Sequence, residues 1–179
     1  MKLPDVHLPK LIRPADGFAF FLGLGSSLLA MLHFFTAPGA LEHWDDVKAA
    51  AREHYLNPRL VAAIVEAASE GRAAARGADG RCGLMAVRGD RLAMADPAKN
   101  LAAGCRELAR IAEAIPDRPR LALFAYHEGG RPAATQLMQK LPQLGSAEII
   151  ERCAEPGARA FIDRVMAAWE RFEPDPHLE

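Results

Sequence analysis

The stretch "NPRLVAAIVEAASEGR", residues 57–72, decides how the rest of the chain is interpreted. The Asn-Pro pair at its start is typical of a new helix, because proline fits the first helical turn. Apolar residues then recur at three- and four-residue intervals, which predicts a helix that ends near Ser69. At 100° per residue, five of them form a stripe about 140° wide that we expect to be buried. The stripe comprises Leu60, Val61, Ile64, Val65 and Ala68.

Two glutamates, Glu66 and Glu70, flank Ala68 in this stretch. Both lie about 150–170° from the centre of the apolar stripe, so we expect them on the solvated face of the helix. A shift of two residues turns a side chain by about 200°, so neither glutamate replaces a side chain at position 68 without distorting the helix. Glu70 stays a candidate for chemistry because the helix ends beside it.

The N-terminal part of the chain carries a long apolar segment, "FAFFLGLGSSLLAMLHFF", residues 18–35. About 20 such residues span a bilayer as a helix, and no charged residue occurs from 17 to 41. Basic residues precede the segment and acidic residues follow it, which places the N-terminus in the cytoplasm. A cleaved signal peptide is the rival interpretation, but the segment is long for one, and "TAPGA" (36–40) lacks a small-x-small cleavage site.

These features predict an inner (cytoplasmic) membrane protein with a single pass and a periplasmic C-terminal domain. Small residues spaced four apart in the apolar segment allow close packing with a transmembrane partner. The predicted organisation is a cytoplasmic arm (1–16), an anchor and linker (17–41), a helical domain (42–173) and a polar tail (174–179).

The composition excludes several classes of function. The formal net charge of −1 provides no basic field for nucleic acid. The three cysteines, Cys82, Cys105 and Cys153, and the histidines lack metal-ligand spacing, and no cofactor motif occurs. One disulfide or buried free thiols both stay open for the cysteines.

The rest of the chain also has helical periodicity, and no stretch alternates with period two. The sequence therefore predicts an all-α domain with a glycine-rich loop at 71–82. On the helix predicted at 95–115, the spacing places five residues on the buried face: Ala102, Cys105, Leu108, Ala109 and Ala112. The other predicted helices are 41–55, 118–130, 132–141 and 157–172.

Five blocks of sequence, taken in order, carry a resemblance to a known family. They are "YLNPRLVAAIV" (55–65), "GLM" (83–85), "DPAKNLAAGCREL" (96–108), "LALFAY" (121–126) and "FIDRVMAAW" (161–169). In this order and spacing they resemble the lysozyme-like lytic transglycosylases, which cleave the glycan strands of peptidoglycan. The resemblance covers roughly residues 48–172 and implies a two-lobed, all-helical domain with a glycan cleft.

The resemblance also implies which residue is missing. In the family, a Glu-Ser pair ends the first core helix, about fifteen residues before the glycine of a Gly-Leu-Met-Gln motif. Counting back from Gly83 gives Ala68, with Ser69 in the position of the family serine. The family glutamate acts as general acid on the glycosidic oxygen and then as general base on the C6 hydroxyl of the sugar. A methyl group neither gives nor takes a proton.

Other positions depart from the family pattern as well. Ala86 replaces the glutamine of Gly-Leu-Met-Gln, which usually helps to bind substrate, and Gly77 replaces a loop serine. In place of Ala-Tyr-Asn-Ala-Gly the chain has "AYHEGG", which keeps Tyr126 but carries His127 and Glu128. Several cleft positions lost together favour natural loss of the active site over a single engineered substitution at position 68.

The sequence therefore predicts a catalytically inactive, membrane-anchored, transglycosylase-like protein. It would act as an accessory, structural or peptidoglycan-facing subunit, with helix 18–35 joining a membrane assembly. The resemblance implies that Ser69, Met85, Tyr126 and His127 contact the glycan. One alternative is an active lytic transglycosylase whose general acid has moved to Glu128 or Glu70, with His127 as a further candidate. Another is a domain that binds glycan without cutting it.

Overall fold

The computed structural model describes residues 39–128, 136, 139 and 145–172 and shows an all-α fold. Contacts divide the chain into 1–37 and 38–179, and the description concerns the second unit. Across the described residues, no helix combines the length and the apolar character that crossing a membrane requires. The predicted membrane helix 18–35 and the tail 174–179 lie outside the described residues.

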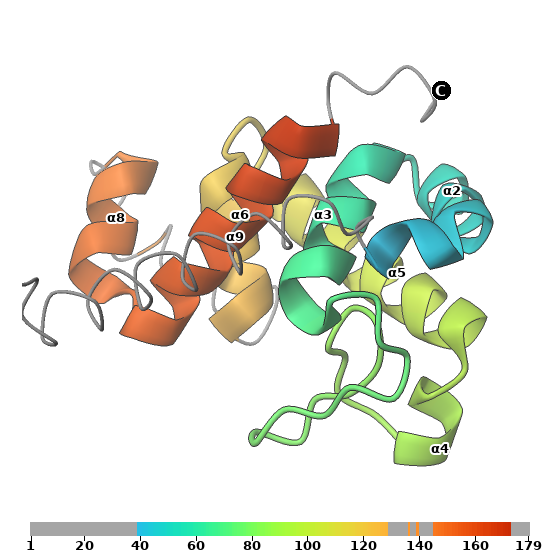
Figure 1. The fold of residues 1–179 in the computed structure, drawn as a ribbon. Coiled ribbons are helices and arrows are strands. Elements are labelled where there is room, and N and C mark those ends of the chain that lie inside the picture. The colour runs from blue at the N-terminus through green and yellow to red at the C-terminus, as the bar shows by residue number, and fades with distance from the viewer. Residues whose placement is uncertain (1–38, 129–135, 137–138, 140–144, 173–179) are drawn as a thin grey trace, which may run out of the picture. The chain divides into compact units, whose positions relative to one another are not determined.

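Helix α3 (Pro58–Ser69) is the centre of this unit, and it has the predicted bounds. The Asn57 side chain caps its first turn by accepting a hydrogen bond from the Arg59 amide at 2.9 Å. The helix ends at Glu70, whose backbone is in the left-handed region with φ 54°. It packs against α9 (Pro156–Phe172) and α2 (Trp44–Glu53), as Figure 1 shows.

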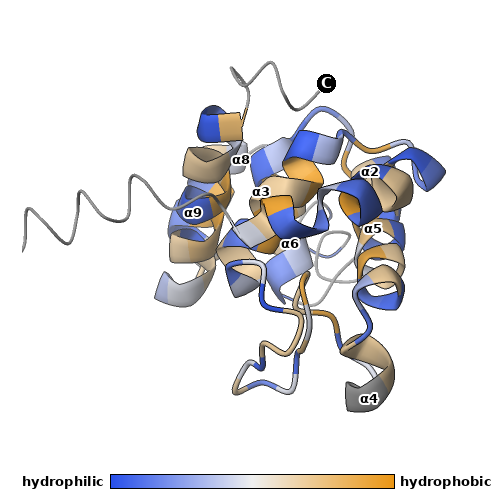
Figure 2. Ribbon diagram, turned by 45° about the vertical axis from the view of Figure 1, so that its right-hand side comes forward, coloured by the Kyte–Doolittle hydropathy of each residue, from blue (hydrophilic) through white to orange (hydrophobic). Residues whose placement is uncertain are grey.

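The remaining helices surround this centre. Helix α5 (Pro97–Ala114) packs against α2 and α6 (Pro119–Glu128), and α6 also packs against α9 and α8 (Ser146–Cys153). Hydrophobic residues gather on α3 and on the parts of its neighbours that form one core (Figure 2). The sequence prediction did not include α8. The helix predicted at 132–141 lies outside the described residues except at 136 and 139, which are helical.

The predicted buried face of α5 was partly wrong. Cys105 and Leu108 are buried as expected, but Ala102 and Ala109 are only half-buried and Ala112 is exposed. The core instead takes the larger residues of this helix, Leu101 and Ile111, together with Gly104. Leucine and isoleucine remove more apolar area from water than alanine, so they set the rotation of the helix.

A short 3-10 helix, η1 (Gly39–His43), packs against the C-terminal end of α3. The Ala40 amide donates to the Glu66 carboxylate at 3.3 Å, and His43 Nε2 lies 3.1 Å from the Gly71 carbonyl oxygen. A Cβ on Gly39 would lie 2.1 Å from the Glu70 carbonyl oxygen, so the two segments touch through their backbones. The expectation that Glu66 is solvated was therefore wrong, because η1 covers that face of the helix and leaves Glu66 half-buried.

Candidate functional site

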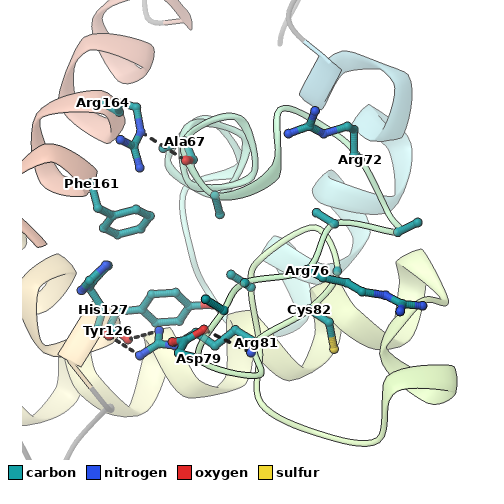
Figure 3. Close-up of a pocket in the computed structure, with 17 residues that line it drawn as sticks. Ala67, Arg72, Arg76, Asp79, Arg81, Cys82, Tyr126, His127, Phe161 and Arg164 are labelled. Carbon is teal, nitrogen blue, oxygen red and sulfur yellow. Dashed lines mark hydrogen bonds and ion pairs between the residues drawn. The ribbon is translucent and has the colours of Figure 1, made fainter. Parts of the chain in front are cut away.

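A hollow of about 660 Å³ opens where the end of α3 meets the loop that follows it. We call it the main hollow. Ala67 and Ala68 of α3 form one side, and loop residues between 72 and 86 form the next. Tyr126 and His127 of α6, with Phe161 and Arg164 of α9, complete the wall (Figure 3). The Arg164 Nε atom lies 3.4 Å from the Ala67 carbonyl oxygen and joins two sides of the wall.

The wall at the end of α3 offers methyl groups and no carboxylate. Ala68 is half-buried and lines the hollow, and Ala67 beside it and Ala86 across the loop do the same. Among the described residues that line the main hollow, Asp79 is the only acid. Its carboxylate is already engaged by Arg81.

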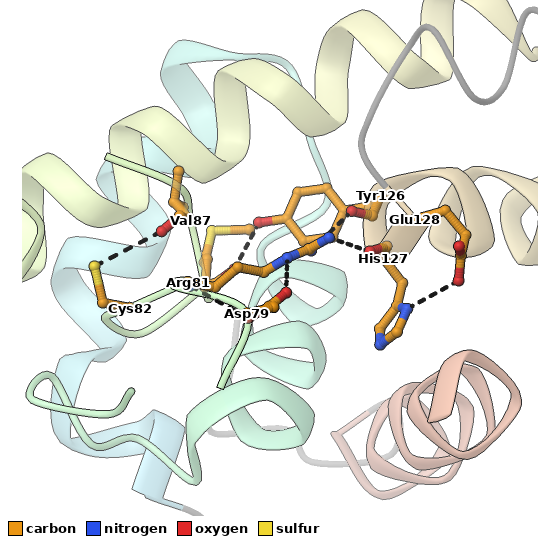
Figure 4. A network of polar contacts seen from close by, with 8 residues as sticks. Asp79, Arg81, Cys82, Val87, Tyr126, His127 and Glu128 are labelled. Carbon is orange, nitrogen blue, oxygen red and sulfur yellow. Dashed lines mark hydrogen bonds and ion pairs between the residues drawn. The ribbon is translucent and has the colours of Figure 1, made fainter. Parts of the chain in front are cut away.

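Arg81 bridges the loop and the end of α6. Its Nε atom lies 2.8 Å from Asp79 Oδ2, an ion pair rather than an aligned hydrogen bond. Its guanidinium donates to the carbonyl oxygen of Tyr126 at 3.2 Å and to that of His127 (Figure 4). The Arg81 side chain is only 13% exposed. Sequence reasoning missed this residue, because an arginine in a glycine-rich loop carries no signal that it crosses to a helix 45 residues further on.

The carboxyl group of Asp79 is held in its charged form. Desolvation raises the pKa of Asp79, but the hydrogen bond from the Arg81 backbone amide and the Arg81 charge lower it by more. The net pKa lies below its ordinary value of 3.8. At neutral pH this carboxylate is therefore a fixed anion that neutralises Arg81, and it has no proton to give to a glycosidic oxygen.

Beneath the main hollow, the turn formed by residues 82–85 is fixed by buried side chains; we call it the pinned turn. Asn100 of α5 accepts from the Met85 amide at 2.8 Å and donates to the Cys82 carbonyl oxygen at 2.9 Å. The Tyr126 hydroxyl donates to the Met85 carbonyl oxygen at 2.8 Å. The Ser69 hydroxyl lies 2.9 Å from the Leu84 carbonyl oxygen. Three elements therefore hold one short turn through its backbone.

The predicted glycan-contacting residues occupy two kinds of position. Ser69 and Met85 are buried and are not among the residues that line the main hollow. The Ser69 hydroxyl also lies 3.0 Å from the Val65 carbonyl oxygen. Tyr126 and His127 do line the hollow. The phenol of Tyr126 is committed to the pinned turn, and burial raises its pKa above the ordinary value.

His127 and Glu128 form a pair at the end of α6. His127 Nδ1 lies 3.4 Å from Glu128 Oε1, and the imidazole packs against the Phe161 ring with centroids 5.2 Å apart. His127 faces the main hollow, whereas Glu128 is not among its lining residues. A histidine that acts as a general base is often oriented by a carboxylate in this way.

Glu70 has a structural environment. It is the C-cap of α3, its side chain is 71% exposed, and its carboxylate lies 3.5 Å from Arg72 Nη2. It is not among the residues that line the hollow. Neither glutamate of the opening stretch therefore faces the space beside Ala68.

Two of the three cysteines have described side chains. Cys82 and Cys105 are free and buried, and burial raises the pKa of Cys105 to about 12. The side chain of Cys153 lies outside the description. The described residues contain no group of three or more histidine, cysteine or acidic side chains placed to hold a metal ion.

Comparison with known proteins agrees with this geometry. A family model described as "Transglycosylase SLT domain" matches residues 45–143, more than half of the chain. The match begins in α2 and includes α3, the pinned turn, α5 and α6. No curated protein matches the chain.

Proposed function

The chain belongs to the transglycosylase SLT domain family, and from that premise we propose that it binds peptidoglycan glycan strands without cleaving them. An SLT domain implies binding to such strands. The observation that carries the proposal is Ala68, a half-buried methyl group on the wall of the main hollow. Cleavage of a glycosidic bond needs a proton donor there, and the Ala68 methyl group supplies none.

The remaining acids near the hollow support this proposal. Asp79 is neutralised by Arg81, Glu70 caps α3, and the Glu66 carboxylate accepts from the Ala40 amide. A general acid also needs a raised pKa in a partly apolar site, whereas the pKa of Asp79 is lowered.

The second candidate function is lytic cleavage from a relocated group. The His127–Glu128 pair favours it, because the imidazole faces the main hollow and its Nδ1 atom contacts a carboxylate. Against it, the same imidazole packs on the Phe161 ring, which shields one of its faces. We therefore place non-catalytic binding first.

We further propose that residues 18–35 anchor the protein in the inner membrane, with the helical domain in the periplasm. The support is the charge-free stretch and the order of basic and acidic residues around it. In this arrangement the anchor joins a membrane assembly and the domain faces the glycan layer as an accessory subunit. We expect the protein to co-purify with a defined membrane complex in mild detergent. A monodisperse monomer would contradict its membership of a membrane assembly.

Digestion of peptidoglycan sacculi tests the absence of lytic activity. The purified protein is incubated with sacculi beside an active member of the family, and soluble anhydro-muropeptides are measured by mass spectrometry. We expect products from the active relative alone. Products from this chain that disappear in Glu128→Gln or His127→Ala, but not in Glu70→Gln, would establish the relocated site instead.

Co-sedimentation with the same sacculi tests binding. We expect the protein in the pellet, and we expect soluble glycan fragments to release it. A protein that stays in the supernatant under both low and moderate salt would refute glycan binding, whatever the digestion shows.

A further inference from the structure

A second hollow of about 350 Å³ lies beside the main hollow. Arg81, Ala86 and Tyr126 line both of them, so the two share a wall. The second hollow extends away from α3 along α5, where Ala103, Arg106, Glu107 and Arg110 line it, and Arg88 contributes from the loop. We call the two hollows together the groove.

The charge of the groove is opposite in sign to that of the chain. Among the described residues, seven arginines and two acids, Asp79 and Glu107, line the two hollows, whereas the whole chain has a formal net charge of −1. Asp79 neutralises Arg81. In the second hollow this leaves Arg88, Arg106 and Arg110 against Glu107 alone.

The three arginines of the second hollow are placed to act on one ligand. Arg106 and Arg110 are one turn apart on α5 and therefore lie on the same face of the helix. Arg88 approaches from the loop beyond the pinned turn. All three are exposed, and among the described residues none of them forms an ion pair within 4.0 Å. Within the described part of the chain, their guanidinium donors are therefore open to a bound anion.

We propose that the second hollow binds carboxylate groups carried by the glycan strand that occupies the main hollow. This inference rests on the proposed function, since it takes peptidoglycan as the ligand. The sugar hydroxyls are neutral, but the lactyl and peptide substituents of such a strand carry carboxylates. A guanidinium matches the geometry of a carboxylate with two parallel hydrogen bonds, which a lysine does not.

The shared wall selects the glycan carboxylate over a free anion. A ligand that spans Arg81, Ala86 and Tyr126 places its sugars in one hollow and a substituent in the other. The groove thus recognises a charged strand by holding it at two places, and a small anion would meet only one of them. A neutral polymer of the same sugars would lose the second set of contacts.

The test measures binding of two matched probes to the full chain in a non-ionic detergent. One probe is a peptidoglycan tetrasaccharide with free lactyl carboxylates, and the other is the same tetrasaccharide with those groups converted to amides. By calorimetry at low salt we expect the charged probe to bind about tenfold more tightly. Raising the salt concentration should shrink that difference, because exposed charges are screened.

A pair of variants assigns the effect to the second hollow. Arg106→Gln with Arg110→Gln should abolish the preference for the charged probe and leave affinity for the amidated probe within about twofold. The control, Arg52→Gln with Arg171→Gln, removes the same charge from two exposed residues that line neither hollow, and it should keep the preference. Circular dichroism and thermal unfolding verify that both variants fold.

Each other outcome counts against a defined claim. Equal affinity of the native protein for the two probes would overturn the carboxylate site and leave glycan binding intact. No binding of either probe would overturn the proposed function itself. Displacement of the charged probe by millimolar inorganic phosphate, with the total ionic strength held constant, would show a general anion site. That result would refute selection for the glycan.

Discussion

The pinned turn and the wall of the main hollow are neighbours with opposite properties. The turn is held through its backbone by Ser69, Asn100 and Tyr126, and all three are buried. The wall beside it presents the methyl groups of Ala68 and Ala86 to open space. The residues that hold the turn are therefore largely different from the residues that line the open side of the main hollow at the end of α3.

The difference predicts where substitutions are costly. A substitution in the pinned turn, or in the side chains that hold it, disturbs buried hydrogen bonds and close backbone contacts. A substitution at Ala68 or Ala86 in the wall places the new side chain in open solvent. The residues that line the groove can consequently vary while the fold persists, which is consistent with a match to the family model across α3, the pinned turn, α5 and α6.

The largest effect is expected from Gly83→Ala in the pinned turn. Gly83 has φ +80°, and a Cβ there would lie 2.0 Å from Asn100 Nδ2 and 2.4 Å from the Met94 carbonyl oxygen. We expect the free energy of unfolding to fall by about 4 kcal/mol, because strain and a clash with fixed groups add. Urea titration followed by circular dichroism measures this change.

Gly80→Ala is the matched control for that variant. Gly80 also has a positive φ, of +84°, but a Cβ there would meet nothing within 4 Å. Its expected cost is the backbone strain alone, about 1 kcal/mol. Equal losses of unfolding free energy at the two positions would mean that the pinned turn rearranges to accept a Cβ at little cost. The turn would then be no more rigid than the wall of the main hollow.

Asn100→Ala should have the next largest effect. It leaves the buried Met85 amide without its partner and removes one of two hydrogen bonds to the Cys82 carbonyl oxygen, which still accepts from the Val87 amide at 3.0 Å. The expected cost is about 2 kcal/mol. Hydrogen exchange at the Met85 amide should accelerate more than at amides in the middle of α9. An unchanged exchange rate at Met85 would show that the turn does not depend on Asn100.

The sequence predicted the helices better than the contacts between them, for physical reasons. The bounds of helix α3 follow from local periodicity and the Asn-Pro start, whereas its register with "GLM" is what the family resemblance implies. The contact between Arg81 and α6 depends on packing between distant segments, so no local pattern announces it. The sequence near Glu66 does not indicate its half-burial for the same reason, because η1, which covers it, comes from another part of the chain.

Asn100 and α5 show the same limit within one helix. The sequence predicts the helix, and an asparagine in its first turn looks like an ordinary polar residue near a cap. Only the tertiary structure places this amide beneath Gly83, where it binds two backbone groups of the pinned turn. The spacing of alanines likewise misplaced the buried face, because Leu101 and Ile111 have more apolar area to bury.

A substitution in the wall should cost far less than one in the pinned turn. Ala68→Glu adds a carboxyl group at a half-buried position that faces a hollow of about 660 Å³. We expect the free energy of unfolding to change by about 1 kcal/mol or less, because the longer side chain reaches solvent instead of the core. A loss as large as that of Gly83→Ala in the same urea titration would mean that the wall is packed as tightly as the turn.

The smallest effect tests Asp79, the only acid among the described residues that line the main hollow. Because the folded pKa of Asp79 lies below its ordinary value of 3.8, ionised Asp79 stabilises the fold at every pH above that value. This contribution is lost as the pH falls through the lowered pKa. Asp79→Asn should therefore reduce stability by less than about 1 kcal/mol at pH 7, since its side chain is 49% exposed, and the difference from the native protein should vanish once the pH falls below the lowered pKa of Asp79. Urea titrations at several pH values measure this difference in unfolding free energy, and Asp46→Asn is the control for a lost charge outside the groove.

A difference that persists unchanged into strong acid would show that Asp79 acts through its shape and hydrogen bonds. The groove would then not depend on the ion pair between Asp79 and Arg81.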